Sequence, residues 1–334
     1  MKIIRRLKKR ISLFMFSKSS KTTLQPRSLN PGTLVPELLF DIGNKFVEDG
    51  ESDALIKFAL SGKLQFQAVV KVFDSITTLK LCETCFFIGG NDNPCCKFGL
   101  KTDNPQSPIL VQLIGNSIKN LQLNCNISDG KCQMYQSFID VIVAKKQLTS
   151  FSADVCCSRT FLAEFLPHFS STLKNLVVPS KLMSAAFCDS FDLDSLTVLN
   201  TMELNFSMLC KTLSLKLSYI QLDDPIIQRY EHPVSHNEQI NPHLSSVKEF
   251  TIDDIYICYH IDRFETTITD FPSLKSLNYN IAMKNGIFSI GILRNHISRF
   301  TTIINQSKNV PSKITCFFYN SSKMDKFVVF VVFC

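Results

Sequence analysis

The sequence of 334 residues has no tryptophan, only 11 glycines and only 13 prolines. Glycine and proline at this level exclude a collagen-like or low-complexity chain. Long apolar runs are also missing, because the longest one, residues 327–334, is far shorter than the roughly 20 residues that a membrane-spanning helix needs. We therefore expect a folded protein without a transmembrane segment.

Acidic residues are absent from the first 33 positions, which carry nine of the 36 lysines and arginines. The remaining chain has 27 basic and 29 acidic residues, so the formal net charge of +7 belongs to the basic stretch. A nucleic-acid-binding domain would carry surplus positive charge on a folded face, and we therefore expect no nucleic-acid partner. Residues 1–33 are predicted to form a basic, disordered tail. An amphipathic membrane-surface helix, a mitochondrial presequence and a nuclear import signal are open alternatives.

Motifs that carry catalysis are missing as well. No G-x-S-x-G, H-E-x-x-H or G-x-x-x-x-G-K-[ST] sequence occurs, and no spacing of serine, histidine and aspartate favours a triad. The sequence thus predicts no catalytic residues, no cofactor and no enzyme. The 13 cysteines are an odd number in a long chain without a secretory signal, which favours reduced thiols and a cytoplasmic or nuclear location.

Two groups of residues could in principle bind a metal ion. Cys82-x-x-Cys85 precedes the adjacent pair Cys95-Cys96, but a second zinc-binding pair normally has two residues between its cysteines. His232, His236 and His243 lie in a stretch where Pro233 disfavours a helix. We expect packed thiols and a solvated loop from these groups, and no metal site.

What the sequence does contain is 45% hydrophobic residues, arranged at first with helical spacing. Pro36 suits the first turn of a helix, and Leu38, Leu39, Ile42 and Phe46 follow it at spacings of three or four. Ser52 or Asp53 can cap a second helix, and Gly62 separates that helix from a third. Residues 34–73 are therefore predicted to be a small domain of three helices.

From residue 75 onward, short phrases of alternating apolar residues recur. Residues 75–81 and 117–123 share the order Ser-Ile, two polar residues and Leu-x-Leu. Related phrases contain Leu148/Phe151/Ala153, Leu173/Leu176/Val178, Leu196/Leu199, Val247/Phe250/Ile252, Leu274/Leu277/Tyr279 and Ile297/Phe300. A short strand repeated at such intervals, with a helical or irregular return, is typical of a solenoid.

These phrases resemble the leucine-rich repeat, in which h-x-x-L-x-L is followed three residues later by Asn or Cys. Two of them complete that pattern, with Asn126 after Leu123 and with Cys156 after Ala153. The resemblance implies that Asn126 and Cys156 point inward and bond free backbone groups. Residues 75–334 are predicted to form an irregular α/β solenoid that recognises a protein.

The helical segment resembles an F-box. The likeness lies in Leu34-Val35-Pro36-Glu37-Leu38-Leu39-Phe40-Asp41-Ile42, then Phe46, Asp53-Ala54-Leu55 and Ala59-Leu60-Ser61 with Lys63. F-box proteins are adaptors that dock on a Skp-family protein of a cullin-based ubiquitin ligase, while their repeats hold a substrate. The resemblance implies this function for the chain, with Leu34, Pro36, Leu39 and Ile42 as the adaptor-binding residues and a Skp-like adaptor and cullin complex as partners.

Two other interpretations stay open. The helical segment could be an N-terminal cap on a leucine-rich-repeat scaffold that has no role in a ligase. An enzyme whose site is spread over the repeats is the least favoured class, because no constellation of residues supports it. The identity of the protein substrate cannot be read from the sequence.

Overall fold

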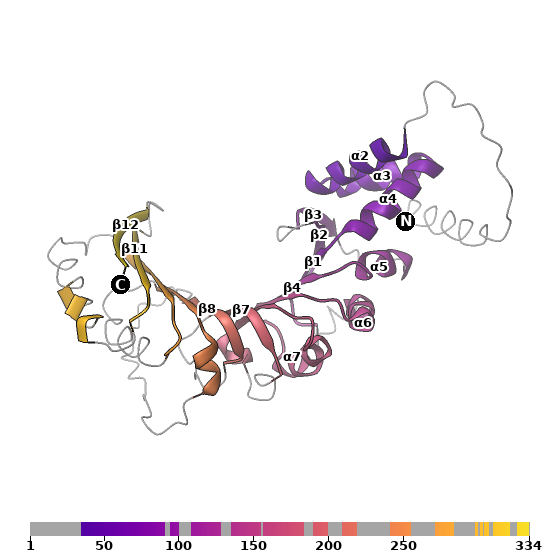
Figure 1. Ribbon diagram of the computed structural model, residues 1–334. Helices are drawn as coiled ribbons and strands as arrows, with labels where there is room; N and C mark the ends of the chain where they lie inside the picture. Colours follow the sequence, from indigo (N-terminus) through magenta and orange to yellow (C-terminus); the bar gives the residue numbers. More distant parts are fainter. Residues whose placement is uncertain are drawn as a thin grey trace. The chain divides into compact units, whose positions relative to one another are not determined.

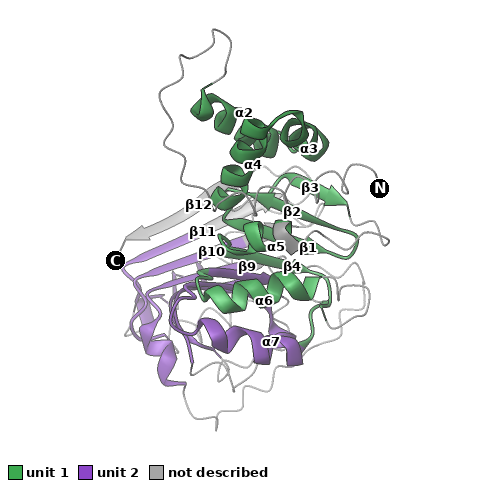
Figure 2. Ribbon diagram, turned by 90° about the vertical axis from the view of Figure 1, so that its right-hand side faces the viewer, with its two compact units in different colours: residues 1–149, 156–158 green, residues 150–155, 159–334 purple. Residues whose placement is uncertain are grey.

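The computed structural model describes residues 35–90, 94–99, 108–127, 135–154, 156–183, 190–199, 209–218, 241–254, 271–283, 298–299, 301–302, 304–306, 310–320 and 326–333. The chain has a mixed α/β fold and divides into two compact units. The first unit comprises residues 1–149 and 156–158, and the second comprises residues 150–155 and 159–334 (Figure 2).

The first unit begins with three helices, α2 (Pro36–Glu48), α3 (Ser52–Ser61) and α4 (Lys63–Ser75). Pro36 occupies the first turn of α2, where its missing N–H costs nothing. Gly50 turns the chain between α2 and α3 with a φ of 77°, in the left-handed region that glycine tolerates best. The predicted capping by Ser52 or Asp53 is wrong, because α3 starts at Ser52 without a side-chain cap.

Four strands follow in the first unit: β1 (Thr78–Cys82), β2 (Cys85–Gly89), β3 (Cys96–Gly99) and β4 (Asn120–Asn124). They lie in the order β4-β1-β2-β3, with β1 parallel to β4 and antiparallel to β2, and with β2 antiparallel to β3. Helices α5 (Pro108–Gly115) and α6 (Gln136–Lys145) lie side by side on one side of these strands (Figure 1). Alternate strand residues, such as Leu79 and Leu81, are fully buried.

The second unit contains eight strands that follow chain order. They are β5 (Ser150–Ala153), β6 (Asn175–Pro179), β7 (Asp192–Leu199), β8 (Lys211–Ser218), β9 (Glu249–Asp254), β10 (Ser276–Met283), β11 (Lys313–Asn320) and β12 (Lys326–Phe333). Neighbours from β5 to β11 are parallel, and β12 returns antiparallel to β11. Among the described connections are α7 (Arg159–Phe165) and the short 3₁₀ helices η3 (Leu166–Phe169), η4 (Ser180–Leu182) and η7 (Pro242–Ser246).

The recurring apolar phrases correspond to one register in this sheet. A single row of paired positions runs through Phe151, Leu176, Leu196, Leu215, Phe250, Leu277 and Ile314, and every member is buried. Each parallel strand therefore contributes the same inward position to a continuous core. This row explains why a short apolar phrase repeats along the chain.

Two details of the predicted phrases are corrected by the structure, and a third lies outside the residues that it describes. The inward partner of Leu196 is Val198 rather than Leu199, because successive side chains of a strand point to opposite faces. The strand β8 carries a phrase, with Leu215 and Leu217 buried, that the sequence analysis missed. Ile297 and Phe300 lie outside the described residues, and the flanking residues 298–299 and 301–302 are helical rather than extended.

The predicted boundary between residues 73 and 75 does not separate the two compact units. Helix α4 continues to Ser75, and α2 contacts both β2 and β3. The thiol of Cys95, just before β3, lies 3.0 Å from the carbonyl oxygen of Val47 and 3.1 Å from that of Glu48 at the end of α2. These contacts make the helices and strands β1–β4 parts of one unit.

Cys157, and not the predicted Cys156, is the cysteine that points inward and contacts backbone carbonyl groups. Cys156 is exposed, whereas Cys157 is buried and its Sγ lies 3.5 Å from the carbonyl oxygens of Leu123 and Cys125. The expectation for Cys156 was therefore off by one residue. Asn126 is half-buried.

Candidate docking surface

Helix α2 presents two different apolar faces. Leu39, Gly43 and Val47, spaced four residues apart, are buried against the rest of the unit. Val35, just before the helix, together with Leu38 and Ile42 forms a second row at spacings of three and four. Val35 is 53% exposed, Leu38 is 42% exposed and Ile42 is half-buried. The second row is the outer face of α2.

The inner face of α2 lies unusually close to α4. A Cβ placed on Gly43 would lie 2.8 Å from Cγ2 of Val72, which is closer than real carbon contacts come. Phe46 of α2 and Phe58 of α3 pack with ring centroids 5.7 Å apart. Glycine at position 43 therefore allows α2 to approach α4 and α3 closely.

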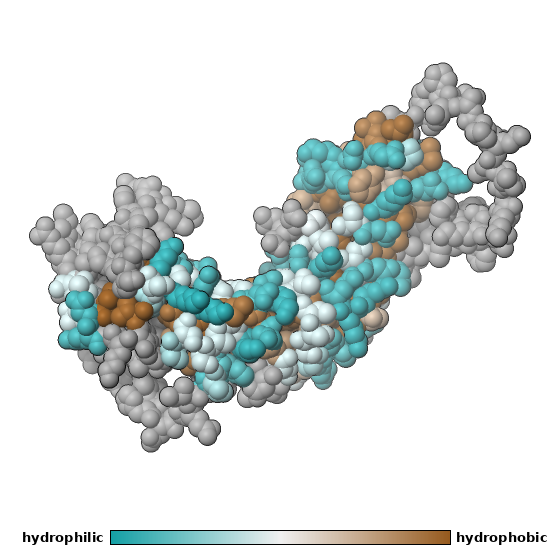
Figure 3. Space-filling model, in the orientation of Figure 1, coloured by the Kyte–Doolittle hydropathy of each residue, from teal (hydrophilic) through white to brown (hydrophobic). Residues whose placement is uncertain are grey.

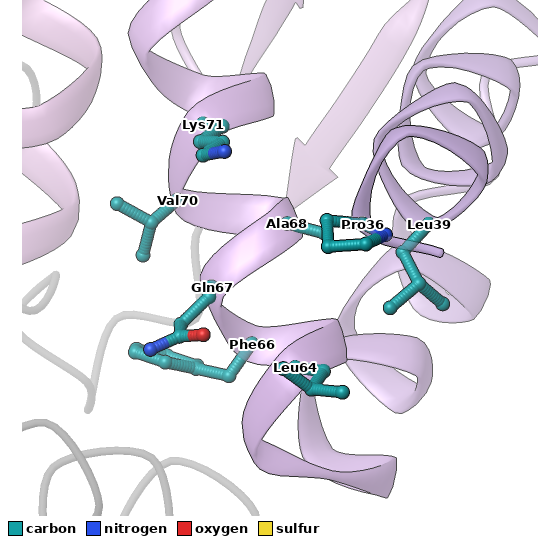
Figure 4. Close-up of a pocket in the computed structure, with 8 residues that line it drawn as sticks. All are labelled: Pro36, Leu39, Leu64, Phe66, Gln67, Ala68, Val70 and Lys71. Atoms are coloured by element: carbon teal, nitrogen blue, oxygen red, sulfur yellow. The ribbon is translucent and has the colours of Figure 1, made fainter. Parts of the chain in front are cut away.

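A groove of about 410 Å³ opens between α2 and α4. Eight residues line it: Pro36, Leu39, Leu64, Phe66, Gln67, Ala68, Val70 and Lys71 (Figure 4). Most of this lining is apolar, and Gln67 and Lys71 supply its polar groups. Small concave sites with an apolar lining and few polar groups are typical binding sites.

Exposed apolar side chains are concentrated on the same helices that form this groove, and one of them, Leu64, lines it. In the part of the chain that the structure describes, four large apolar side chains are strongly exposed: Val35, Leu38, Leu64 and Leu213. Three of them belong to α2, to the residue before it and to α4. Figure 3 shows hydrophobic surface, in brown, in the region of the helices of the first unit. We define the docking surface as Val35, Pro36, Leu38, Ile42 and Leu64.

The structure places the predicted adaptor-binding residues in different environments. Leu34 lies outside the described residues. Pro36 is exposed and lines the groove, and Ile42 is half-buried on the outer face. Leu39 also lines the groove but is only 1% exposed, and its part in adaptor binding stays a prediction. Its side chain belongs to the packed face that α2 shares with Gly43 and Val47.

Sequence analysis missed Val35, Leu38 and Leu64 as surface residues. The sequence does indicate the outer row of α2, because Val35, Leu38 and Ile42 fall at positions i, i+3 and i+7 of one helical face. Leu39, Gly43 and Val47 form the competing row, in which glycine marks the close helix contact. A buried glycine in a helix would have identified the inner face.

The second unit has a polar sheet face of its own. Lys216 on β8 lies 2.5 Å from the Asp253 carboxylate on β9, and the amide of Asn280 on β10 donates to the same carboxylate at 2.5 Å. Asp253 and Asn280 are direct cross-strand partners. Side chains from three neighbouring strands thus form one connected polar row on the face opposite the buried one.

A second charge pair lies at the beginning of β7 and β8. Lys211 lies 2.8 Å from the Asp192 carboxylate, directly across the strand pair. The hydrogen bond from Lys211 lowers the pKa of Asp192. Both side chains are well exposed, so this pair contributes little to stability.

The cysteines considered for zinc are not brought together. Cys95 lies against the end of α2, while Cys82 and Cys85 face each other between β1 and β2. Across the described residues, no cluster of three or more His, Cys, Asp or Glu side chains has the arrangement of a metal site. His243 lies half-buried in η7, and His232 and His236 lie outside the described residues.

Burial changes the acidity of two of these thiols. Burial raises the pKa of the Cys82 thiol and the adjacent Cys85 raises it further, whereas the ammonium groups of Lys80 and Lys97 act in the opposite direction. Burial, with a smaller contribution from Cys95, raises the pKa of Cys96 to about 12. Both thiols are therefore protonated at neutral pH.

No helix in the described part of the chain is long and apolar enough to cross a membrane. Comparisons with protein-family models, with curated proteins and with solved structures found no match to this chain.

Proposed function

We propose that this protein is the substrate-recognition adaptor of a Skp–cullin–F-box ubiquitin ligase. In this proposal α2, α3 and α4 form an F-box-like domain whose docking surface binds a Skp-like adaptor. The strands of the second unit form a leucine-rich-repeat-like region that binds a protein substrate. The protein itself catalyses no reaction and works in the cytoplasm or the nucleus.

The observation that carries the proposal is the docking surface itself. Exposed apolar side chains lie on α2 and α4, which also form an apolar groove, and Pro36 and Leu64 belong to both the docking surface and the groove. Burying such side chains against a partner gains about 25 cal/mol for each Å² of apolar surface removed from water. Helices that present an exposed apolar row commonly bind a partner through that row.

The position of this surface agrees with the F-box resemblance. The motif residues Pro36 and Ile42 are accessible or partly accessible, and Leu38 is accessible beside them. The motif leucine Leu39 has a different role, since it holds α2 in the unit. The proposal therefore assigns docking to Val35, Pro36, Leu38, Ile42 and Leu64, and stability to Leu39.

The sheet of the second unit supports the substrate-binding part of the proposal. Parallel strands in chain order, with one inward row of apolar residues, are the arrangement that a solenoid of repeats requires. The opposite face carries the connected row of Lys216, Asp253 and Asn280. Polar side chains on a rigid sheet give a protein partner hydrogen-bonding groups in fixed positions.

One observation favours a second candidate, a repeat scaffold with a helical cap. Helices α2 and α3 contact β3, and α2 also contacts β2, as a cap on the end of a sheet would. A cap needs no exposed apolar row, however, because its outer face meets water. The exposed Val35, Leu38 and Leu64 therefore favour docking.

Affinity purification of the tagged full chain from cells, followed by mass spectrometry, tests this proposal. We expect a Skp-like adaptor and a cullin to be recovered with the wild-type chain and to be lost with the variant Leu38→Asp. The matched control is Lys57→Asp, an exposed position on α3 away from the groove. Recovery of other partners without any Skp-like protein would select the repeat scaffold instead.

A further inference from the structure

Two thiols face each other at the turn between β1 and β2. Leu81 pairs with Phe86 in this antiparallel hairpin, so the next pair toward the turn is Cys82 and Cys85. Only Glu83 and Thr84 separate them along the chain. This pairing places the two cysteines on directly opposing positions of the hairpin. Cysteines on opposing strands can form a disulfide when their Cα atoms are as near as strand partners are.

The hydroxyl group of Tyr135 contacts the backbone on both sides of the turn between β1 and β2. The Tyr135 hydroxyl lies 2.6 Å from the carbonyl oxygen of Cys82 and 2.8 Å from that of Cys85. Tyr135 is fully buried at the start of α6. Because both carbonyls are fixed to one group, the two cysteines keep a constant spacing while their side chains react.

The accessibility of the two thiols differs. Cys82 is half-buried, whereas Cys85 is only 6% exposed. An oxidant therefore meets Cys82 first. Cys85 reacts afterwards, with the sulfur that is already beside it.

Two lysine side chains, Lys80 and Lys97, lie near Cys82. Lys80 and Lys97 are the cross-strand neighbours of Phe87, and their ammonium groups lie 6.0 Å and 5.9 Å from the centre of its ring. Neither ammonium forms an ion pair with any carboxylate among the described residues. Burial raises the pKa of Cys82, and the two ammonium groups oppose this effect in part by favouring the thiolate, which is the nucleophile in thiol exchange.

We propose that Cys82 and Cys85 form a reversible thiol–disulfide site that exchanges with a low-molecular-weight disulfide such as glutathione disulfide. The Cys82 thiolate attacks one sulfur of the oxidant, whose S–S bond breaks and releases one glutathione thiolate. Cys85 then loses its proton and attacks the Cys82 sulfur, which expels the second glutathione thiolate. One protein disulfide forms, glutathione disulfide is reduced, and the two thiol protons end on two glutathione molecules.

The intramolecular second step decides how readily this pair oxidises. Cys95 is an exposed thiol whose contacts are backbone carbonyls, so its reaction ends at a mixed disulfide. A thiol already in place reacts as if it were present at very high concentration. We therefore expect the Cys82–Cys85 pair to oxidise under milder conditions than Cys95. Half of the pair should be oxidised at a ratio of glutathione disulfide to glutathione at least about tenfold lower than the ratio at which half of Cys95 is modified.

Peptide mass mapping of the full chain in a series of glutathione redox buffers tests this inference. The expected result is a peptide containing Cys82 and Cys85 that has lost two hydrogen atoms and recovers them on reduction. In Cys85→Ser the expected product is glutathione attached to Cys82. The matched control Cys95→Ser should leave the midpoint of the pair unchanged.

The surrounding lysines provide a separate readout. Lys80→Met with Lys97→Met should slow oxidation, because removing the two ammonium groups lowers the fraction of Cys82 that is present as thiolate. A persistent mixed disulfide at Cys82 in the wild-type chain would overturn the inference. A bond from Cys82 to any cysteine other than Cys85 would overturn it as well. Neither result depends on adaptor binding.

Discussion

Gly43 on α2 and Val72 on α4 approach so closely that a Cβ on Gly43 would lie 2.8 Å from Cγ2 of Val72. Val72 is fully buried, and its β-branched side chain has one strongly preferred rotamer in a helix. The valine therefore cannot turn away without strain. This contact fixes which face of α2 is packed and, by exclusion, which face remains for a partner.

Gly43→Ala should destabilise the first unit. Overpacking a tight core costs about 1 to 3 kcal/mol, and the better helix propensity of alanine returns about 1 kcal/mol, so we expect a net loss of up to about 2 kcal/mol. Urea unfolding of the full chain measures it. The double variant Gly43→Ala/Val72→Ala should lose less unfolding free energy than the sum of the losses of the two single variants, by at least about 0.5 kcal/mol. Strict additivity would show that the two residues do not touch.

Truncation to alanine should lower the free energy of unfolding strongly at Leu39 and hardly at all at Leu38. Leu39→Ala removes a fully packed side chain and should cost about 2 to 5 kcal/mol of unfolding free energy. Leu38→Ala changes a surface position and should stay within about 0.5 kcal/mol of the wild type. Thermal unfolding of both variants checks the assignment of the two faces. Equal effects would mean that the inner and outer rows of α2 are misassigned.

Tyr135→Phe should loosen the turn between β1 and β2. The substitution removes the hydroxyl that bonds the carbonyl oxygens of Cys82 and Cys85, and leaves these buried acceptors without it. We expect a loss of about 1 to 3 kcal/mol. Hydrogen exchange at Glu83 and Thr84 should become faster, while exchange in α3 should not change. Unaltered exchange at the turn would contradict the role given to this hydroxyl.

Cys96 should make the protein less stable at alkaline pH. Its thiol has a pKa raised to about 12 in the folded chain from an ordinary value of 9.0. Between these values the unfolded chain has lost the thiol proton and the folded chain has kept it, so the free energy of unfolding decreases as pH rises. Below about pH 9 both states bind the proton and this contribution is complete. Unfolding midpoints measured from pH 8 to pH 11 should fall less steeply in Cys96→Ala. Parallel curves would disprove the assignment.

Local spacing predicted α2, α3 and α4 well, because each of them is bounded by a proline or a glycine, whereas α5 and α6 of the same unit were not predicted. Pro36 begins α2, Gly50 turns the chain before α3, and Gly62 stands between α3 and α4. These residues act through backbone geometry alone. Apolar alternation likewise predicted most of the strands, since inward positions such as Phe250 and Leu277 must be apolar in any register that buries them.

The parts that the sequence did not predict depend on neighbours distant along the chain. Leu38 and Leu39 are adjacent leucines of equal hydrophobicity, and only the approach of Val72 to Gly43 decides which of them is buried. Cys156 and Cys157 are distinguished in the same way, by the carbonyl groups of Leu123 and Cys125. The surroundings of Cys82 combine Lys80 of the same strand with two residues distant along the chain, Lys97 on β3 and Tyr135 at the start of α6. No local spacing carries that information.

The most direct test of the proposed function is a titration of the full chain with a purified Skp-like adaptor, using wild type, Leu38→Asp and Lys57→Asp. We expect a one-to-one complex with wild type and with Lys57→Asp. Leu38→Asp should keep its melting temperature and lose about 2 to 4 kcal/mol of binding free energy, a 30- to 1,000-fold weaker affinity, because a charge would enter an apolar contact. Absence of binding to any Skp-like protein by the wild type, or equal affinity for all three chains, would contradict the proposal.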